Sequence, residues 1–217
     1  MIKIERVSVM NWDNAIRGAR NPMNSWEKSD SGLTLMNPID VEFGYEPDYE
    51  YLIGENDLSL LMRLRNAGPD ERKFMRQIFV SVDITAPLYW WKEFDTYKVG
   101  TVSNSCSTMH KIHAKEFTLD DFSREHLDPL SLDALMGTIV CLNINRQAFI
   151  GLKDKKYWWQ LIQLLPTSYN QLRTVTLNYE VLANMYAARK SHKLDEWRDL
   201  CKWIETLPYS QLITGDI

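Results

Sequence analysis

The sequence is poor in cysteine: its 217 residues contain three thiols, Cys106, Cys141 and Cys201. An odd and sparse count argues against a disulfide framework and is typical of proteins in a reducing compartment, so the sequence predicts a cytoplasmic protein. No uninterrupted apolar run reaches the roughly 18 residues that a membrane-spanning helix needs. Residues 1–6 already carry charges, which predicts that no secretory signal begins the sequence.

The sequence also lacks an excess of positive charge. It has 25 Lys and Arg residues against 29 Asp and Glu residues, with a net charge of −4 and no basic cluster. Proteins that coat nucleic acid depend on clustered cations, so nucleic acid is excluded as the expected partner. A small anionic ligand needs only two or three well-placed cations and remains compatible with this composition.

Phosphate loops and metal sites are missing as motifs. The nine glycines are scattered and form no Gly-rich phosphate loop. Cys106, His110 and His113 lie close together in the sequence, but no second ligand pair follows at a zinc-like spacing. The sequence therefore predicts no bound metal.

What is present is an ordinary globular composition with many tryptophans. Hydrophobic residues make up 45% and charged residues 25% of the sequence, and no repeat or linker divides it, which predicts one domain over residues 1–217. Two of the eight tryptophan positions begin doublets, Trp90-Trp91 and Trp158-Trp159. Neighbouring helical residues point about 100° apart. We therefore expect one ring of each doublet in the core and the other facing a partner or ligand.

The periodicity of apolar residues predicts a few strands and a helix-rich C-terminal half. Alternating patterns predict strands at residues 2–9 and 78–84. Helices are expected at 13–20, 56–66, 131–165 with a break near Gly151, 177–189 and 194–207, with a further helix starting at residues 85–87. Residues 21–47 are expected to be irregular. Residues 97–107 are rich in Ser, Asn and Gly, and could offer hydroxyl and N–H groups to an anion.

One stripe of the late helix combines polar ends with an apolar middle: Asn178, Leu182, Met185 and Arg189. The two polar residues lie roughly 16 Å apart along a helix axis. An amide and a cation at opposite ends of one face could hold an extended anionic ligand. The alternative, core packing with solvated ends, is commoner for such a stripe.

The same residues carry a resemblance to a known family. Leu165-Pro166, Thr176-Leu177-Asn178, Asn184 and Arg189 stand at the spacings found in the C-terminal part of the flavin-dependent thymidylate synthases. In that family a Leu-Pro precedes a Thr-x-Asn that opens a helix, a second Asn follows six residues later, and an Arg follows eleven residues after the first Asn. The resemblance implies that Asn178 and Asn184 contact FAD and that Arg189 contacts the nucleotide.

The central signature of the family is matched only in part. It consists of Arg-His-Arg, seven residues, and a Ser, and its place here is taken by residues 97–107. Ser107 and Asn104 match the family's Ser and Asn, and Lys98 is the one cation left from Arg-His-Arg. The resemblance implies a catalytic and substrate-binding role for Ser107 and Arg189, a substrate contact for Asn104 and a cofactor contact for Lys98.

Several other family residues are replaced. Met109 and Glu180 stand where the family has arginines. The upstream His-x-Ser and Glu-His pairs fall on Pro69, Glu71, Phe74 and Met75. Because the missing groups bind phosphates and polarise flavin and base, these departures leave the implied fold intact, weaken the implied activity and predict weak or absent FAD binding.

The resemblance implies an α+β fold that is rich in helix and has a small central sheet. It also implies a homotetramer with flavin sites shared between subunits. It implies that the chain methylates dUMP to dTMP with FAD and methylenetetrahydrofolate, so that a small nucleotide and a folate are the expected partners. The alternative is a non-catalytic protein on the same fold that binds a nucleotide, a flavin or another protein.

Overall fold

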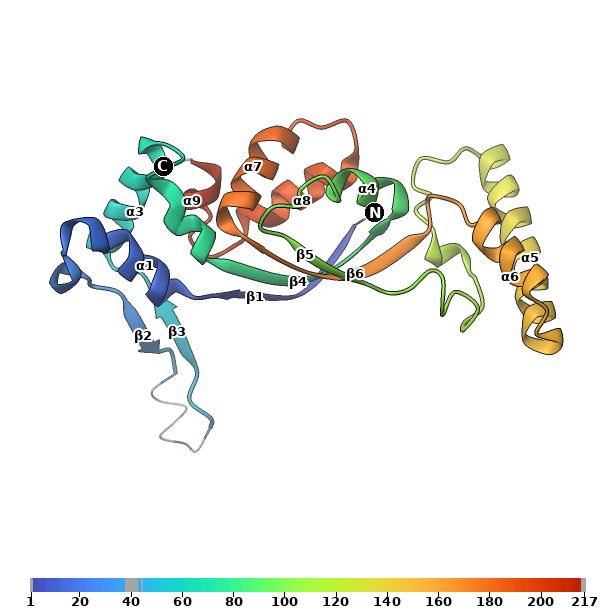
Figure 1. Ribbon diagram of the computed structural model, residues 1–217, viewed down its shortest axis with the longest axis horizontal. Helices are drawn as coiled ribbons and strands as arrows, with labels where there is room; N and C mark the ends of the chain where they lie inside the picture. Colours follow the sequence, from blue (N-terminus) through green and yellow to red (C-terminus); the bar gives the residue numbers. More distant parts are fainter. Residues whose placement is uncertain (1, 38–42, 44, 216–217) are drawn as a thin grey trace. The chain divides into compact units, whose positions relative to one another are not determined.

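Four strands form the larger sheet of the protein, in the order β1-β4-β6-β5 (Figure 1). The structure is a computed structural model that describes residues 2–37, 43 and 45–215. The strands are β1 (Lys3–Met10), β4 (Phe79–Pro87), β5 (Val102–Ser105) and β6 (Asn170–Asn178). β5 runs antiparallel to β6, with Val102 opposite Thr176 and Ser105 opposite Arg173. The α+β prediction, with much helix and a small sheet, is confirmed.

Strand β6 was not expected from the sequence. The two predicted strands at residues 2–9 and 78–84 correspond to β1 and β4. In β6, Gln171, Val175 and Leu177 are buried while the residues between them are more exposed. One of the inward residues is polar, which obscures the alternating pattern. The helix predicted from residue 177 therefore begins two residues later, at Tyr179.

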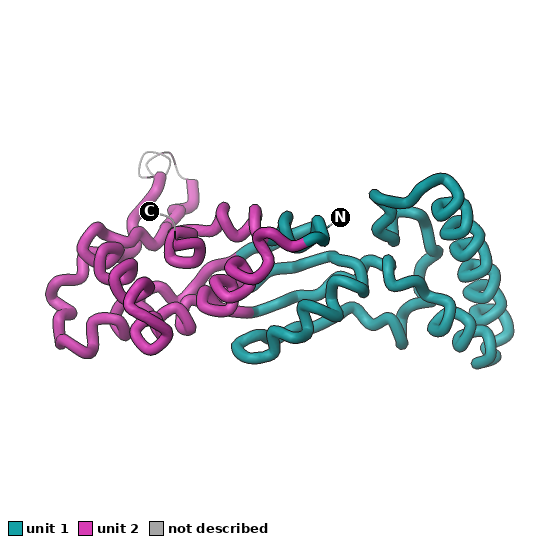
Figure 2. Tube along the Cα trace, turned by 90° about the horizontal axis from the view of Figure 1, so that it is seen from above, with its two compact units in different colours: residues 1–7, 81–176, 193–200 teal, residues 8–80, 177–192, 201–217 magenta. Residues whose placement is uncertain are grey.

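The chain divides into two compact units, coloured separately in Figure 2. Unit 1 comprises residues 1–7, 81–176 and 193–200, and unit 2 comprises residues 8–80, 177–192 and 201–217. Strands β1, β4 and β6 contribute residues to both units. The single-domain assignment of residues 1–217 stays a prediction.

Two clusters make up the core of unit 1. One surrounds the long helix α5 and its neighbour α6, and contains Ile112, Phe117, Phe122, Leu135, Ile139, Leu142 and Leu161. The other gathers the rings of Trp90, Trp91, Phe94 and Trp197. The helical elements of this unit are α4 (Leu88–Phe94), η4 (Leu119–Asp121), α5 (Pro129–Leu152), α6 (Lys155–Leu164) and the first part of α8 (Asp195–Glu205).

The break in the long helical region is confirmed, but it lies two residues beyond Gly151. Lys153 adopts a left-handed conformation with φ of 55°, and Asp154 then caps α6 by accepting the backbone N–H of Lys156 at 2.9 Å. By length and composition α5, with a mean hydropathy of 1.2, is the one helix among the described residues that could cross a membrane. Asp133 and Arg146 lie within this helix, so its uninterrupted apolar runs stay shorter than 18 residues.

Neither tryptophan doublet shows the expected split between one ring in the core and one ring facing outward. Trp90 and Trp91 are 0% and 1% exposed, so both rings of this doublet enter the core. Helix α4 has seven residues, and both rings reach the cluster that also contains Trp197. Trp159 is 44% exposed and its neighbour Trp158 is half-buried, so neither ring of this doublet lies fully in the core. The helix expected to start at residues 85–87 is α4. Thr85 lies within β4, and Pro87 is the N-cap of α4.

Unit 2 is built from short helices and a two-stranded sheet. Its elements are α1 (Trp12–Arg20), η1 (Asn21–Met23), η2 (Trp26–Lys28), β2 (Gly32–Leu35), β3 (Tyr49–Leu52), α3 (Glu55–Ala67), η3 (Arg72–Gln77), α7 (Tyr179–Arg189) and α9 (Gln211–Thr214). Strands β2 and β3 form a hairpin, with Gly32 opposite Leu52, and β2 lies in the region 21–47 that was predicted to be irregular. Part of that region, residues 38–42 and 44, lies outside the described residues.

The helix expected at residues 56–66 is α3, and neither Asn56 nor Asp57, the two residues that could have capped it, is its N-cap. The N-cap is Gly54, and the Asp57 side chain is instead fully buried against Arg20, whose Nε lies 2.6 Å from Oδ1. Ser29 and Ser31 donate to the other carboxylate oxygen at 2.7 and 2.6 Å. The carboxylate thus joins α1 and α3 to the loop between η2 and β2.

Candidate functional site

Asn178 joins strand β6 to helix α7 and serves as the helix cap. Its side-chain oxygen accepts the backbone N–H of Val181 at 3.0 Å, and the residue is 7% exposed. Asparagine is among the preferred caps because its short amide satisfies a backbone donor that the first turn leaves unpaired. The oxygen of Asn178 is therefore committed to the helix, and a ligand would meet only its amide nitrogen.

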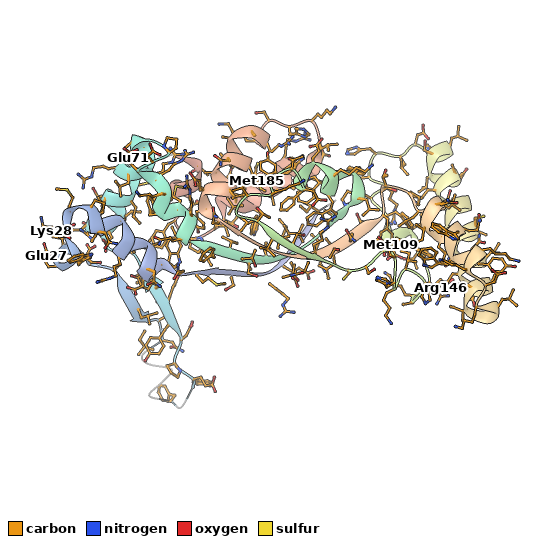
Figure 3. The ribbon with its side chains drawn as sticks, in the orientation of Figure 1. Glu27, Lys28, Glu71, Met109, Arg146 and Met185 are labelled. Carbon is orange, nitrogen blue, oxygen red and sulfur yellow. The ribbon has the colours of Figure 1, made fainter. Side chains whose placement is uncertain are left out.

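The stripe from Asn178 to Arg189 faces the protein core. Its two middle residues, Leu182 and Met185, are 0% exposed (Met185 is labelled in Figure 3). The hypothesis that this face holds an extended ligand is wrong, and core packing is the correct reading. Arg189 is half-buried in the last turn of α7, where a cation also interacts favourably with the helix dipole.

Four polar residues meet where α7 lies beside η3, and they are here called the α7 cluster. Arg72 and Arg76 lie on η3, and Glu180 and Asn184 lie on α7. Glu180 is buried and lies one turn before the exposed Asn184. Its carboxylate contacts two guanidinium groups: Arg72 Nε lies 3.4 Å and Arg76 Nη2 lies 3.3 Å from Oε1, and Arg76 Nε contacts Oε2. Arg72 Nη2 also lies 3.5 Å from Oδ1 of Asn184.

The charges of the α7 cluster stabilise one another. The hydrogen bond from Arg76 lowers the pKa of the Glu180 carboxyl below its usual value, although burial acts in the opposite direction. The same hydrogen bond raises the pKa of Arg76. Glu180 and Arg76 are therefore ionised at neutral pH, and together with the guanidinium group of Arg72 they give the cluster one net positive charge.

Arg72 and Arg76 were missed as site residues by the sequence reading. They lie on η3, Arg72 between the positions that correspond to the family's His-x-Ser and Glu-His pairs and Arg76 directly after them. The signal that could have found them is the opposite change at two places: a carboxylate replaces a family arginine at position 180, while two arginines are present at positions 72 and 76.

Ser107 lies in unit 1, directly after β5. Its Oγ accepts the backbone N–H groups of Met109 and His110 at 3.1 and 2.9 Å, which closes the turn that follows (Met109 is labelled in Figure 3). The hydroxyl hydrogen of Ser107 therefore remains for a further partner. The residue lines a hollow of about 280 Å³.

This hollow, here called the Ser107 hollow, is polar. Its wall includes Lys115, Asp121 and Tyr169, and Lys115 forms an ion pair with Asp121. Burial raises the pKa of the Tyr169 hydroxyl, so the phenol is neutral at physiological pH. Gln171 Nε2 donates to the carbonyl of Cys106 at 2.7 Å and fixes the rim. Hydroxyl, ammonium and phenol groups in one hollow suit a polar ligand of nucleoside size.

Lys98 and Ser107 line different hollows, so the structure does not bring these two predicted residues together. Lys98 lines a smaller hollow of about 130 Å³ with Tyr97, Thr101 and Ser103. Asn104 is exposed on β5, opposite Thr174 of β6. Within the residues that the structure describes, no group of three or more His, Cys, Asp or Glu side chains could hold a metal ion.

Comparison with known proteins identifies the fold. No protein-family model matches the chain, and no curated protein sequence matches it. Among solved structures, thymidylate synthase X from Helicobacter pylori, crystallised with FAD and dUMP, superposes with a TM-score of 0.68 at 17% identity, over 99% of this chain and 98% of that chain.

A second similar structure is that of a nucleotide methylase. The UMP/dUMP methylase PolB from Streptomyces cacaoi, bound with 5-Br UMP, superposes with a TM-score of 0.60 at 12% identity, over 95% of this chain and 87% of that chain. The fold predicted from the late helix and the residue 97–107 segment is thus confirmed: the chain has the fold of the flavin-dependent thymidylate synthases.

Proposed function

We propose that this protein binds FAD and a uridine nucleotide and methylates that nucleotide, with dUMP as substrate and methylenetetrahydrofolate as carbon donor. The observation that supports this proposal is the likeness, over 99% of the chain, to a protein crystallised with both FAD and dUMP. The cytoplasm is the expected location.

The side chains that are present suit these ligands unevenly. Asn184 is exposed and retains two amide N–H donors for FAD, since its oxygen faces Arg72. Arg189, Ser107 and Asn104 are the residues proposed to hold the nucleotide, and Lys98 a second cofactor contact. Bound FAD, once reduced, would supply the hydride that turns a methylene group into a methyl group.

A non-catalytic binding protein is the second candidate, and one observation favours it. Glu180, in place of a family arginine, presents a carboxylate that is already held by Arg72 and Arg76. Tyr97 and Val99 likewise replace two cationic signature residues. Groups that would polarise the flavin and the base are therefore missing from this chain, while the exposed amide of Asn184 and the guanidinium of Arg189 are retained.

Release of the C5 hydrogen of dUMP separates the two candidates. Methylation replaces that hydrogen, so tritium at C5 should appear in water when protein, FAD, NADPH and methylenetetrahydrofolate are mixed with labelled dUMP. Arg189→Lys keeps the charge but loses the planar fork, and we expect dUMP binding to weaken about tenfold or more by calorimetry, equivalent to about 1.4 kcal/mol. Binding without tritium release would support the non-catalytic candidate. No heat with dUMP at millimolar concentration would contradict nucleotide binding.

Self-association is also proposed, and helix α5 offers a surface for it. One exposed stripe of α5 consists of Asp133, Met136, Val140, Ile144 and Gln147. Val140 and Ile144 are 59% and 63% exposed, which leaves a row of apolar side chains facing solvent. The stripe carries one charge only, so attraction to an anionic lipid surface is not its expected use.

The order of residues in this stripe suits a second copy of the chain. Met136 and Ile144 lie four residues on either side of Val140, and Asp133 and Gln147 lie seven residues on either side. In an antiparallel helix pair about a two-fold axis at Val140, Met136 would face the partner's Ile144, and Asp133 the partner's Gln147. The same stripe is then complementary to itself. We propose that it forms one contact of a homotetramer.

Val140→Asp tests this contact, because it places two carboxylates on the proposed axis. We expect light scattering to show a smaller assembly than the wild type at the same micromolar concentration. Val99→Asp is a matched control, since Val99 is 89% exposed on a loop of the same unit. A monomeric wild type, or a Val140→Asp variant of unchanged mass, would contradict the proposal.

A further inference from the structure

The α7 cluster has a surplus of positive charge at the position where the family carries one arginine. We propose that Arg72 and Arg76 together form an anion subsite that binds a phosphate group of the ligand and takes over the role of the arginine missing at position 180. This inference rests on the proposed function, because it assigns a role within that binding site.

The carboxylate of Glu180 is committed to the two arginines. Its Oε1 contacts both Arg72 and Arg76, and its Oε2 contacts Arg76. A carboxylate with 11% side-chain exposure that receives donors on both oxygens has little capacity left for a ligand. Its remaining function is to hold two guanidinium groups side by side, which limits the side-chain entropy that is lost when they bind an anion.

The groups of the α7 cluster that remain for a ligand are all hydrogen-bond donors. The side chain of Arg76 is 57% exposed and that of Arg72 is 26% exposed. Within the described residues, no partner is found for the Nη1 atom of either arginine. Asn184 turns its oxygen toward Arg72, so its amide N–H groups are directed elsewhere. A surface of two guanidinium groups and one amide nitrogen matches the acceptor oxygens of a phosphate.

The other carboxylates near η3 leave the two arginines free for an anion. Asp70 raises the pKa of Arg76 through its charge, but among the described residues it makes no hydrogen bond or ion pair with Arg76. Asp70, Glu71 and Lys73 line a separate hollow of about 590 Å³ whose wall includes neither Arg72 nor Arg76. Among the described residues, Glu180 is therefore the one carboxylate in contact with the two arginines, and the cluster keeps a net positive charge.

A charge-swap series provides the test. Arg76→Glu changes the net charge of the cluster from +1 to −1, and we expect FAD or dUMP to bind at least tenfold more weakly in calorimetric titrations. The double variant Arg76→Glu with Glu180→Arg restores the net charge and returns a cation to the family's position on α7, so it should recover most of the affinity. Arg63→Glu is the matched control, because Arg63 is exposed on α3 of the same unit.

The choice of probe identifies the phosphate. If the subsite binds the flavin phosphates, Arg76→Glu weakens FAD and leaves riboflavin unchanged. If it binds the nucleotide phosphate, the same change weakens dUMP and leaves deoxyuridine unchanged. Inorganic pyrophosphate serves as a probe without flavin or base. Arg76→Gln, which only neutralises the charge, covers the case in which Arg76→Glu fails to fold, as judged by circular dichroism.

The outcomes keep the inference and the proposed function apart. If the wild type binds FAD or dUMP and the Arg76 variants bind them equally well, the inference is wrong and the proposed function stands. If only pyrophosphate binds, and Arg76→Gln weakens it, the anion subsite is supported while the proposed function fails. If the wild type binds none of the probes, both are wrong. Recovery of thermal stability without any change in binding identifies a purely structural ion pair.

Discussion

Replacing Asp57 by Ala should lower the free energy of unfolding by about 3–5 kcal/mol, because it leaves the buried guanidinium of Arg20 without its counter-charge. Arg20 is 4% and Asp57 is 0% exposed. The change also removes the acceptor for Ser29 and Ser31, which anchor the loop before β2. Urea unfolding followed by circular dichroism measures the loss.

Glu55→Ala is the control for this prediction. Glu55 lies in the same first turn of α3 and is exposed, so its removal should cost at most about 0.5 kcal/mol. Equal losses in the two variants would show that the buried pair with Arg20 has no special weight.

The Asp57 pair also predicts a dependence on pH. Burial alone would raise the pKa of this carboxyl, but hydrogen bonds from Ser31, Ser29 and Arg20 outweigh burial and lower it. A folded-state pKa below the unfolded value of about 3.9 contributes stability above that pH, and this stability is lost as the pH falls through the folded pKa. The difference in stability between wild type and Asp57→Asn should therefore shrink below about pH 4. A difference that is constant from pH 7 to pH 2 would contradict this account.

The elements that the sequence predicted well are those whose apolar residues repeat without interruption. Strand β4 buries Val80, Val82, Ile84 and Ala86 in strict alternation, and it was found. Strand β6 buries Gln171 at one inward position, and it was missed. The Gln171 side chain is satisfied by the carbonyl of Cys106, a contact 65 residues away in sequence. Local patterns carry no information about such a partner.

The candidate site shows the same division between local and distant information. The cap at Asn178 follows from the residues around it, and α7 begins at the next residue. The contacts of Glu180 with Arg72 and Arg76 span more than a hundred residues. From sequence alone, Glu180 was a lost arginine, whereas in the folded chain it is the acceptor that holds two others. The family resemblance predicts which segments form the site, whereas the ion pairs of Glu180 are seen only in the folded chain.

Trp197→Ala should destabilise the protein by about 3–5 kcal/mol, the range for removing a large aromatic side chain from a core. Trp197 is 0% exposed, and its ring centroid lies 4.9 Å from that of Trp90 and 6.4 Å from that of Phe94. Its Nε1 donates to Glu93 at 2.8 Å, so Trp197→Phe, which keeps an aromatic ring, should still lose about 0.5–1.5 kcal/mol for the hydrogen bond.

Trp159→Ala provides the contrast: its ring is 44% exposed, and we expect a loss of about 1 kcal/mol or less in the same denaturant titration. The doublets make the comparison informative, because sequence reasoning assigned Trp90-Trp91 and Trp158-Trp159 the same split between core and surface. If Trp159→Ala proved as harmful as Trp197→Ala, the exposed ring of α6 would be covered in solution, and the cluster of Trp90, Trp91, Phe94 and Trp197 would not be the dominant core of unit 1.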